Sequence, residues 1–94
     1  MARLNRNEVG AKVDAGNVVV SSSASQVVDQ NSQRVSLSLR NNGETDLFFG
    51  FTASVTTVTG YPLLPDEEYE FVDYMGPVYV ICATTGDLRY YEVY

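Results

Sequence analysis

Five acidic residues lie within eight positions of the sequence, the densest group of side chains that could carry chemistry. They are Asp66, Glu67, Glu68, Glu70 and Asp73. Carboxylates this close together could bind calcium or form the acid pair of a glycosidase. However, the Asp-x-Asp-x-Asp-Gly spacing of a calcium loop is missing, and alternation predicts that Glu68 and Glu70 point outward from a strand. The group therefore indicates a solvated face, or a face that docks a basic partner.

The sequence contains no histidine and a single cysteine. Without histidine, neither a Ser-His-Asp nor a Cys-His pair can form, and a histidine-ligated metal site is excluded. Cys82 lies in the most apolar stretch of the chain with no basic neighbour to activate it, so we expect a buried, unreactive thiol that forms no internal disulfide. The residues thus predict a protein that is not an enzyme and that has no cofactor and no metal site.

Tyrosines and one proline-framed loop supply the candidate contacts with a partner. Tyrosine can stack on a sugar ring, but it also serves in strand cores and in protein interfaces. The loop predicts either an exposed apolar contact or a segment folded back over the end of the core. The candidate contacts in the loop and in the final strand are Tyr61, Leu63, Leu64, Tyr90, Tyr91 and Tyr94.

The length of 94 residues predicts one domain, and the net charge of −6 argues against nucleic-acid binding. Half of the basic residues, Arg3, Arg6 and Lys12, lie near the N-terminus, and the rest of the chain is acidic. We therefore predict a basic arm over residues 1–7 and a β domain over residues 8–94, with these three side chains as further partner contacts. No apolar run is long enough for a membrane span, and the core of a signal peptide is absent.

Alternating apolar and polar side chains predict an all-β protein. The alternation is clearest in residues 34–51, RVSLSLRNNGETDLFFGF, which read as a hairpin. A loop over residues 41–43 would set Leu37 opposite Leu47 and would require Gly43 in the left-handed conformation. Alternatively the two strands belong to different sheets, and then this register does not apply.

The remaining strands are predicted from similar patterns. Residues 78–83, apolar on both faces, are expected to form a central strand, and Pro62 and Pro65 are expected to exclude their loop from ladder pairing. The other expected strands are residues 9–13, 17–20, 26–28, 53–59, 68–73 and 88–94. Together they predict a single-domain antiparallel β-sandwich or Greek-key barrel of about seven to nine short strands.

The order of several short motifs resembles that in small virion proteins of tailed bacteriophages. An Asn-x-x-Arg turn leads into a serine-leucine strand, and an Asn-x-Gly turn, a Gly-x-Pro-Leu loop and a Gly-x-Val-Tyr strand follow. The likeness extends over residues 17–94 and departs from the pattern at residues 66–68 and in the tyrosine-rich end. The matching residues are Asn31, Arg34, Asn42, Gly50, Gly60, Leu63, Gly76, Val78, Tyr79, Arg89 and Glu92.

This resemblance implies a structural virion protein. The first expectation is a capsid decoration or cement protein that binds the head shell, with the major capsid protein or another virion protein as its partner. The alternative is a receptor- or glycan-binding module of a phage fibre or spike. Small domains in the first role usually act as oligomers, so a homotrimer is expected. The protein would be part of the virion, assembled in the host cytoplasm, with neither nucleic acid nor membrane as a partner.

Overall fold

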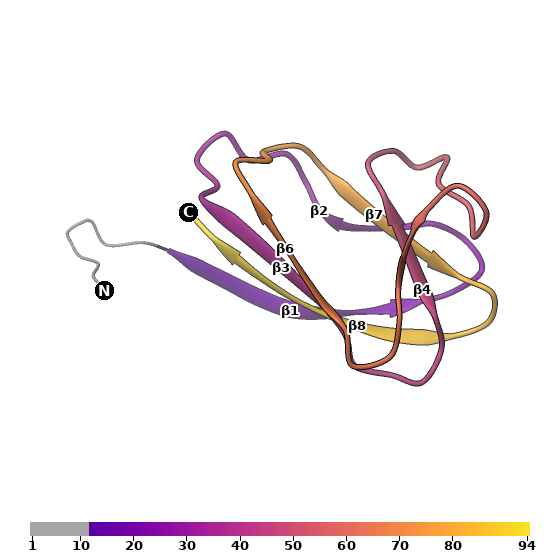
Figure 1. The fold of residues 1–94 in the computed structure, drawn as a ribbon. Coiled ribbons are helices and arrows are strands. Elements are labelled where there is room, and N and C mark those ends of the chain that lie inside the picture. Colours follow the sequence, from indigo (N-terminus) through magenta and orange to yellow (C-terminus); the bar gives the residue numbers. More distant parts are fainter. Residues whose placement is uncertain (1–11) are drawn as a thin grey trace.

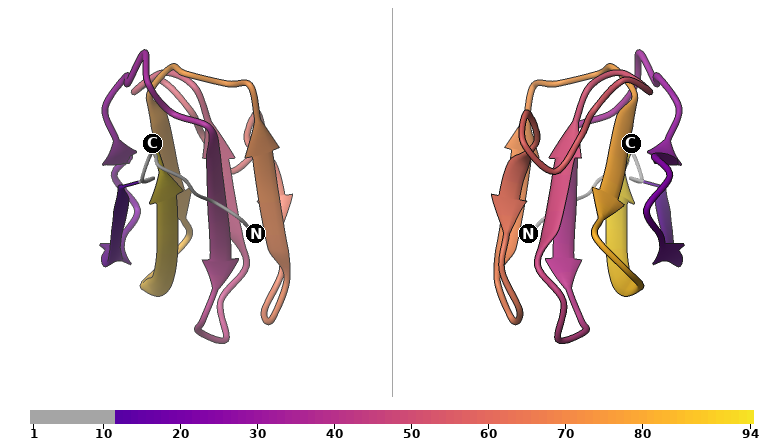
Figure 2. Two further views of the ribbon diagram at one scale, coloured as in Figure 1. Left: turned by 90° about the vertical axis from the view of Figure 1, so that its left-hand side faces the viewer. Right: turned by 90° about the vertical axis from the view of Figure 1, so that its right-hand side faces the viewer.

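The computed structural model describes residues 12–94, which form two four-stranded antiparallel sheets packed face to face (Figures 1 and 2). One sheet has the strand order β1-β8-β3-β6, and the other has the order β2-β7-β4-β5. The strands are β1 (Val13–Val20), β2 (Ser25–Val28), β3 (Ser36–Asn41), β4 (Leu47–Gly50), β5 (Tyr61–Leu63), β6 (Glu68–Val72), β7 (Val78–Cys82) and β8 (Gly86–Val93). This order is that of a jelly roll. It confirms the predicted all-β sandwich.

Strand pairing is nested about the middle of the chain. β4 pairs with β5, β3 with β6, β2 with β7 and β1 with β8. Two further ladders, β3 with β8 and β4 with β7, join these pairs into the two sheets. Consecutive strands therefore lie in opposite sheets, with the exception of β4 and β5. The first half of the chain thus pairs with the second half, as in one long hairpin that is folded into two sheets.

The core lies between the sheets and is filled by alternate positions of the strands. β7 lies between β2 and β4 and is buried along nearly its whole length, as predicted for a strand that is apolar on both faces. β6 is an edge strand and buries only Phe71. The apolar side chains with almost no exposed surface are Val20, Leu37, Leu39, Leu47, Val78, Val80, Cys82 and Leu88.

The hairpin predicted over residues 34–51 is wrong. β3 and β4 lie in different sheets, so Leu37 and Leu47 enter the core from opposite sides instead of facing each other across one ladder. Gly43 does not have a positive φ, and neither does any other glycine in residues 12–94. The alternation of apolar and polar residues predicts which side chains of a strand are buried, but it does not show which strands pair.

The buried side chain of Asn41 shapes the turn that follows β3. Asn41 has no exposed surface. Its Nδ2 group donates to the carbonyl oxygens of Thr45 and Leu63, each at 2.8 Å, and its Oδ1 accepts from the N–H of Gly43 at 3.0 Å. Both ends of the amide are thus paired, as a buried amide requires. This side chain, rather than a left-handed glycine, directs the chain from one sheet to the other.

Two segments differ from the expected local structure. The proline loop contributes β5, because an edge strand needs ladder hydrogen bonds on one side only and can contain Pro62. Residues 53–59, expected as a strand, form turns instead. β1 begins at Val13, and residues 9–11 of the strand expected there lie outside the described residues.

The turns after β4 fold back against that strand. Val55 is buried and lies next to Gly50 and Gly60, where a β-carbon would come within 2.7 Å and 3.0 Å of its Cγ2 atom. Because neither glycine has a side chain, the two ends of this loop can close around Val55. The loop thereby covers part of the outer side of β4.

Gly60 provides a test of this packing. A methyl group at this position would lie 2.7 Å from Cβ of Phe48 and 3.0 Å from the carbonyl oxygen of Thr56. We expect Gly60→Ala to lower the free energy of unfolding by about 1–3 kcal/mol, measured by urea denaturation. Gly43→Ala is the matched control and should cost less, since the nearest atom there is 3.3 Å away. Equal losses in the two variants would contradict the described loop packing.

Candidate interaction surface

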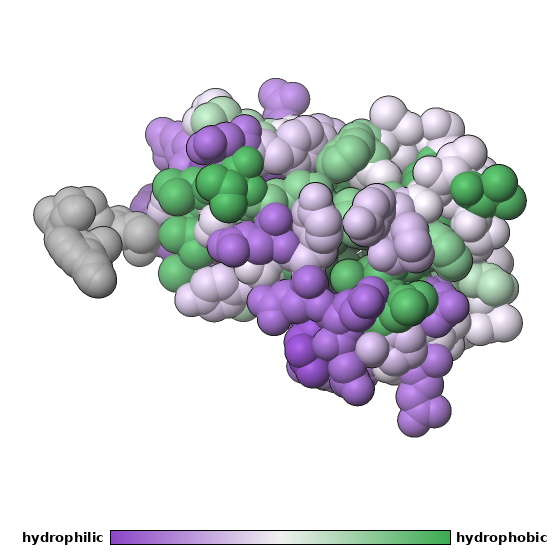
Figure 3. All heavy atoms as spheres, in the orientation of Figure 1, coloured by the Kyte–Doolittle hydropathy of each residue, from purple (hydrophilic) through white to green (hydrophobic). Residues whose placement is uncertain are grey.

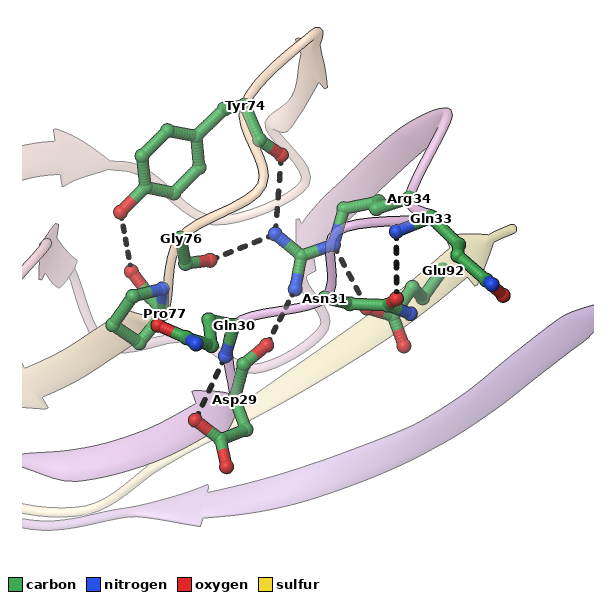
Figure 4. A network of polar contacts seen from close by, with 9 residues as sticks. All are labelled: Asp29, Gln30, Asn31, Gln33, Arg34, Tyr74, Gly76, Pro77 and Glu92. Carbon is green, nitrogen blue, oxygen red and sulfur yellow. Dashed lines mark hydrogen bonds and ion pairs between the residues drawn. The ribbon is translucent and has the colours of Figure 1, made fainter.

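Arg34 carries a charged side chain into one end of the sandwich (Figure 4). It lies just before β3 and is only 2% exposed, and its partner Glu92 on β8 is 6% exposed. The Nε atom donates to Oε2 of Glu92 at 2.8 Å. Nη1 donates to the carbonyl oxygens of Tyr74 at 3.1 Å and Gly76 at 2.7 Å, and Nη2 donates to that of Asp29 at 2.7 Å. One guanidinium thus joins the β2–β3 loop, the β6–β7 loop and β8.

The loops around Arg34 are held by further hydrogen bonds. The N–H of Asn31 donates to the carbonyl oxygen of Met75 at 2.8 Å, and Oδ1 of Asn31 accepts from the N–H of Gln33 at 3.0 Å. The Tyr74 hydroxyl donates to the carbonyl oxygen of Pro77 at 2.7 Å. All three nitrogens of the guanidinium have protein acceptors within this buried end. The arrangement is therefore a structural clamp that holds the two loops against β8.

Burial and nearby charges also shift the pKa values of two tyrosines at this end of the sandwich. Burial raises the pKa of Tyr74 above its ordinary value, although the positive charge of Arg34 opposes the rise. Burial raises the pKa of Tyr90 as well, and the negative charges of Asp14 and Glu92 add to that effect. In the folded state both hydroxyls therefore hold their protons more tightly than free tyrosine does.

The acidic group does not form a metal site. Within residues 12–94 no three His, Cys, Asp or Glu side chains come together in a way that could hold a metal ion. Glu68 and Glu70 are exposed on β6, as alternation predicted, and Asp66 and Asp73 flank this strand with φ values of 67° and 68°. Cys82 is buried, as predicted. The described part of the chain also contains no helix long and apolar enough to cross a membrane.

The structure places the predicted contact residues on separate surfaces. Arg3 and Arg6 lie outside the described residues, and Lys12 is exposed just before β1. Tyr91 is half exposed on the outer face of the β1-β8-β3-β6 sheet. Tyr90, its neighbour in β8, points inward and packs against the core. These residues therefore do not form one site.

The proline loop contains both exposed and buried candidates. Tyr61 and Leu64 are 58% and 42% exposed. Leu63 is only 3% exposed and belongs to the core, so the prediction of a partner contact there is wrong. Tyr94, after β8, is partly buried. Tyr61 also belongs to a larger group of exposed aromatic side chains.

Six aromatic rings form a continuous cluster along the side where β5 and β6 are the edge strands. The centroids of neighbouring rings lie 4.9–6.4 Å apart, and the rings are tilted or edge-on, the favoured geometry for aromatic pairs. Their members are Phe49, Phe51, Tyr61, Tyr69, Phe71 and Tyr74. Because these rings come from several strands in two sheets, the cluster exists only in the folded chain.

Three rings of the cluster are exposed, and we call them the aromatic edge. Phe51, Tyr61 and Tyr69 are 49%, 58% and 38% exposed and rest on the buried rings of Phe49 and Phe71. Figure 3 views the molecule from the same side as Figure 1, with β6 in front, and hydrophobic patches lie among hydrophilic ones there. Contacts with the core hold the exposed rings in place, so these side chains would lose little conformational entropy when a partner binds. The surface is suited to a protein contact.

Comparison with known proteins identifies the fold. No protein-family model matches the chain, and no curated protein sequence matches it. A solved structure of Bacillus endospore appendages, described as a novel family of disulfide-linked pili, superposes with a TM-score of 0.52 at 12% sequence identity. The match covers 99% of this chain and 97% of that chain. At this identity the likeness shows the fold alone.

Removing the charge of Glu92 tests the clamp. Glu92→Gln keeps the size of the side chain but leaves Arg34 without a countercharge in a buried site. We expect a loss of about 3–5 kcal/mol in the free energy of unfolding, measured by urea denaturation. Asp66→Asn is the control, since its pair with Arg40 is long at 3.5 Å and exposed, and should cost less than about 1 kcal/mol. A loss at Glu92 as small as that of the control would show that the clamp contributes little.

The raised tyrosine pKa values predict sensitivity to alkali. A group with a raised pKa in the folded state stabilises the fold fully below its unfolded pKa of about 10, and this stabilisation is lost as pH rises through the folded pKa. We therefore expect the melting temperature to fall as the pH rises above about 10. The fall should be smaller in Tyr90→Phe than in the unmodified protein. Tyr91→Phe changes an exposed ring of the same strand and should leave the curve unchanged; a response equal to that of Tyr90→Phe would contradict the assignment.

Proposed function

We propose that the protein is a structural subunit of a bacteriophage particle, a decoration or cement protein that binds the head shell through its aromatic edge. The observation that carries the proposal is the exposure of Phe51, Tyr61 and Tyr69 on top of core rings. Aromatic side chains concentrate at the centres of protein interfaces, because they bury a large area with few rotatable bonds. The place on a virion comes from the sequence resemblance.

The fold is compatible with this role and with others. Jelly rolls occur in viral capsid proteins, in lectins and in enzymes, so the topology alone does not select a function. The solved structure of similar fold belongs to pili, and pili are assemblies of subunits, which supports assembly in general. Arg3, Arg6 and Lys12 stay predicted contacts with an acidic partner, and the expected homotrimer stays a prediction.

A receptor- or glycan-binding module of a phage fibre is the second candidate. The exposed faces of Tyr61 and Tyr69 favour it, because tyrosine rings also stack on sugars. The two roles differ in copy number and position, which quantitative mass spectrometry of purified particles and labelled electron microscopy would measure. Many copies spread over the head support the cement role, and a few copies at the tail support the fibre module.

Substitution of the aromatic edge tests the proposed contact. Phe51→Ser combined with Tyr61→Ser should weaken sedimentation with particles by about thirtyfold or more, since hot-spot residues contribute about 2 kcal/mol or more. The fold should survive, because both side chains are about half exposed, and circular dichroism would verify this. Val35→Ser removes an equally exposed apolar side chain elsewhere and should bind normally. Unchanged binding of the double variant would exclude the aromatic edge as the contact.

A further inference from the structure

The outer face of the β1-β8-β3-β6 sheet, which faces the viewer in the left panel of Figure 2, carries ordered rows of side chains. Each level contains one residue from each of the four strands, and the three residues from β6, β3 and β8 matter here. From β6 to β8 the levels are Glu68–Arg40–Arg89, Glu70–Ser38–Tyr91 and Val72–Ser36–Val93. One side of β3 is therefore acidic and the other basic at the first level, whereas both sides are apolar at the third.

This face has more apolar surface than the solvated side of a sandwich usually has. Outward positions of antiparallel strands are normally polar. Here Val72 is 65% exposed and Tyr91 is 50% exposed. On β1, Val13 and Val19 are 52% and 68% exposed and lie on the same face by register. Exposed side chains of this kind, next to charged rows, are typical of an interaction surface.

We infer that two copies of the chain pair through this face. β6 and β8 flank β3 at equal spacings of about 4.8 Å. A two-fold axis along β3, in the plane between two facing sheets, would place β8 of one copy over β6 of the other and keep each level in register. Arg89 of one copy then faces Glu68 of the second, and Val93 faces Val72. The contact is self-complementary, as a two-fold interface must be.

Charge selects the second copy as the occupant. The net charge of −6 makes two copies repel in most orientations. This face combines a cation with an exposed acid at matching distances from β3. The Arg89 side chain pairs with Asp87 of its own strand at 3.3 Å, but it is 54% exposed and can also face Glu68 of a second copy, which is exposed. Arg40 lies near the axis, where its repulsion with the second Arg40 is offset by Glu68 beside it and by Asp66 at 3.5 Å.

The size of the face sets the strength of the pairing. Three strands about 4.8 Å apart and about five residues long at about 3.4 Å per residue span roughly 15 by 17 Å. Such a contact covers roughly 250 Å² per copy, well below the roughly 800 Å² per partner of a standard interface, so the pairing is weak. We therefore expect dimers at micromolar to millimolar protein concentrations, the range in which subunits crowded on a shared surface meet. The pairing deepens the proposed structural role, and it differs from the trimer expected from the phage resemblance.

A charge exchange tests the pairing with the protein alone. Arg89→Glu and Glu68→Arg should each weaken dimerisation at least tenfold in sedimentation equilibrium, because each creates two like-charge contacts per dimer. An equal mixture of the two variants should restore dimerisation to within about twofold of the unmodified protein, because both contacts of a mixed dimer again join opposite charges, whereas only mixed dimers can form. Glu44→Arg makes the same charge change as Glu68→Arg, in an exposed loop outside this face, and should stay within twofold of the unmodified protein.

Each other outcome overturns the inference. A monomer at all concentrations up to about 1 mM means that the face does not bind a second copy with the proposed affinity, because a Kd of 1 mM corresponds to only about 4 kcal/mol. A mixture that stays monomeric excludes the two-fold contact. If the unmodified protein is a trimer and mixing the two variants does not restore its assembly, the subunits form a ring through another surface. Particle binding by the aromatic-edge variants tests the proposed function separately, so the two ideas can fail independently.

Discussion

Arg34 places a full positive charge in the end of the sandwich, and distant parts of the chain must be in position to hold it. Glu92 supplies the countercharge from β8, and backbone carbonyls of Asp29, Tyr74 and Gly76 accept the remaining hydrogen bonds. A buried ion without these partners would lose several kcal/mol of hydration without compensation. The β2–β3 and β6–β7 loops are therefore held in place because their carbonyl groups must solvate the Arg34 guanidinium.

Several residues of the motif that resembles phage virion proteins lie at the Arg34 clamp. Asn31, Arg34, Gly76 and Glu92 all belong to the matching motif and all meet at this end of the molecule. Two other motif residues, Gly50 and Gly60, are adjacent to Val55. The motif thus consists largely of residues that fix turns and loops of the jelly roll. The aromatic edge and the outer face of the β1-β8-β3-β6 sheet involve mostly other positions.

The sequence could predict strands and burial, because both depend on local patterns. Residues 78–83 and 68–73 were expected as strands and correspond to β7 and β6 with a shift of one residue at one end. Pairing could not be predicted in this way, since alternation gives the face of a side chain and not the identity of the neighbouring strand. The clamp was missed for the same reason: Arg34 and Glu92 are 58 positions apart. Of the aromatic edge, the sequence pointed to Tyr61 as a partner contact and to Tyr69 only as one of several tyrosines able to stack on a sugar.

The nested strand order also limits how the chain can fold during synthesis. In the described chain β1 pairs with β8, β2 with β7, and β3 with β6 and β8. During synthesis β3 therefore has no ladder partner until β6 is made, β2 none until β7, and β1 none until β8. β4 and β5 close the shortest loop, and closure costs more entropy as the separation grows. We therefore expect structure to form outward from the middle of the chain, with the ladder between its first and last strands closing at the end. In a chain that ends before β8, β1 would therefore lack its native ladder partner.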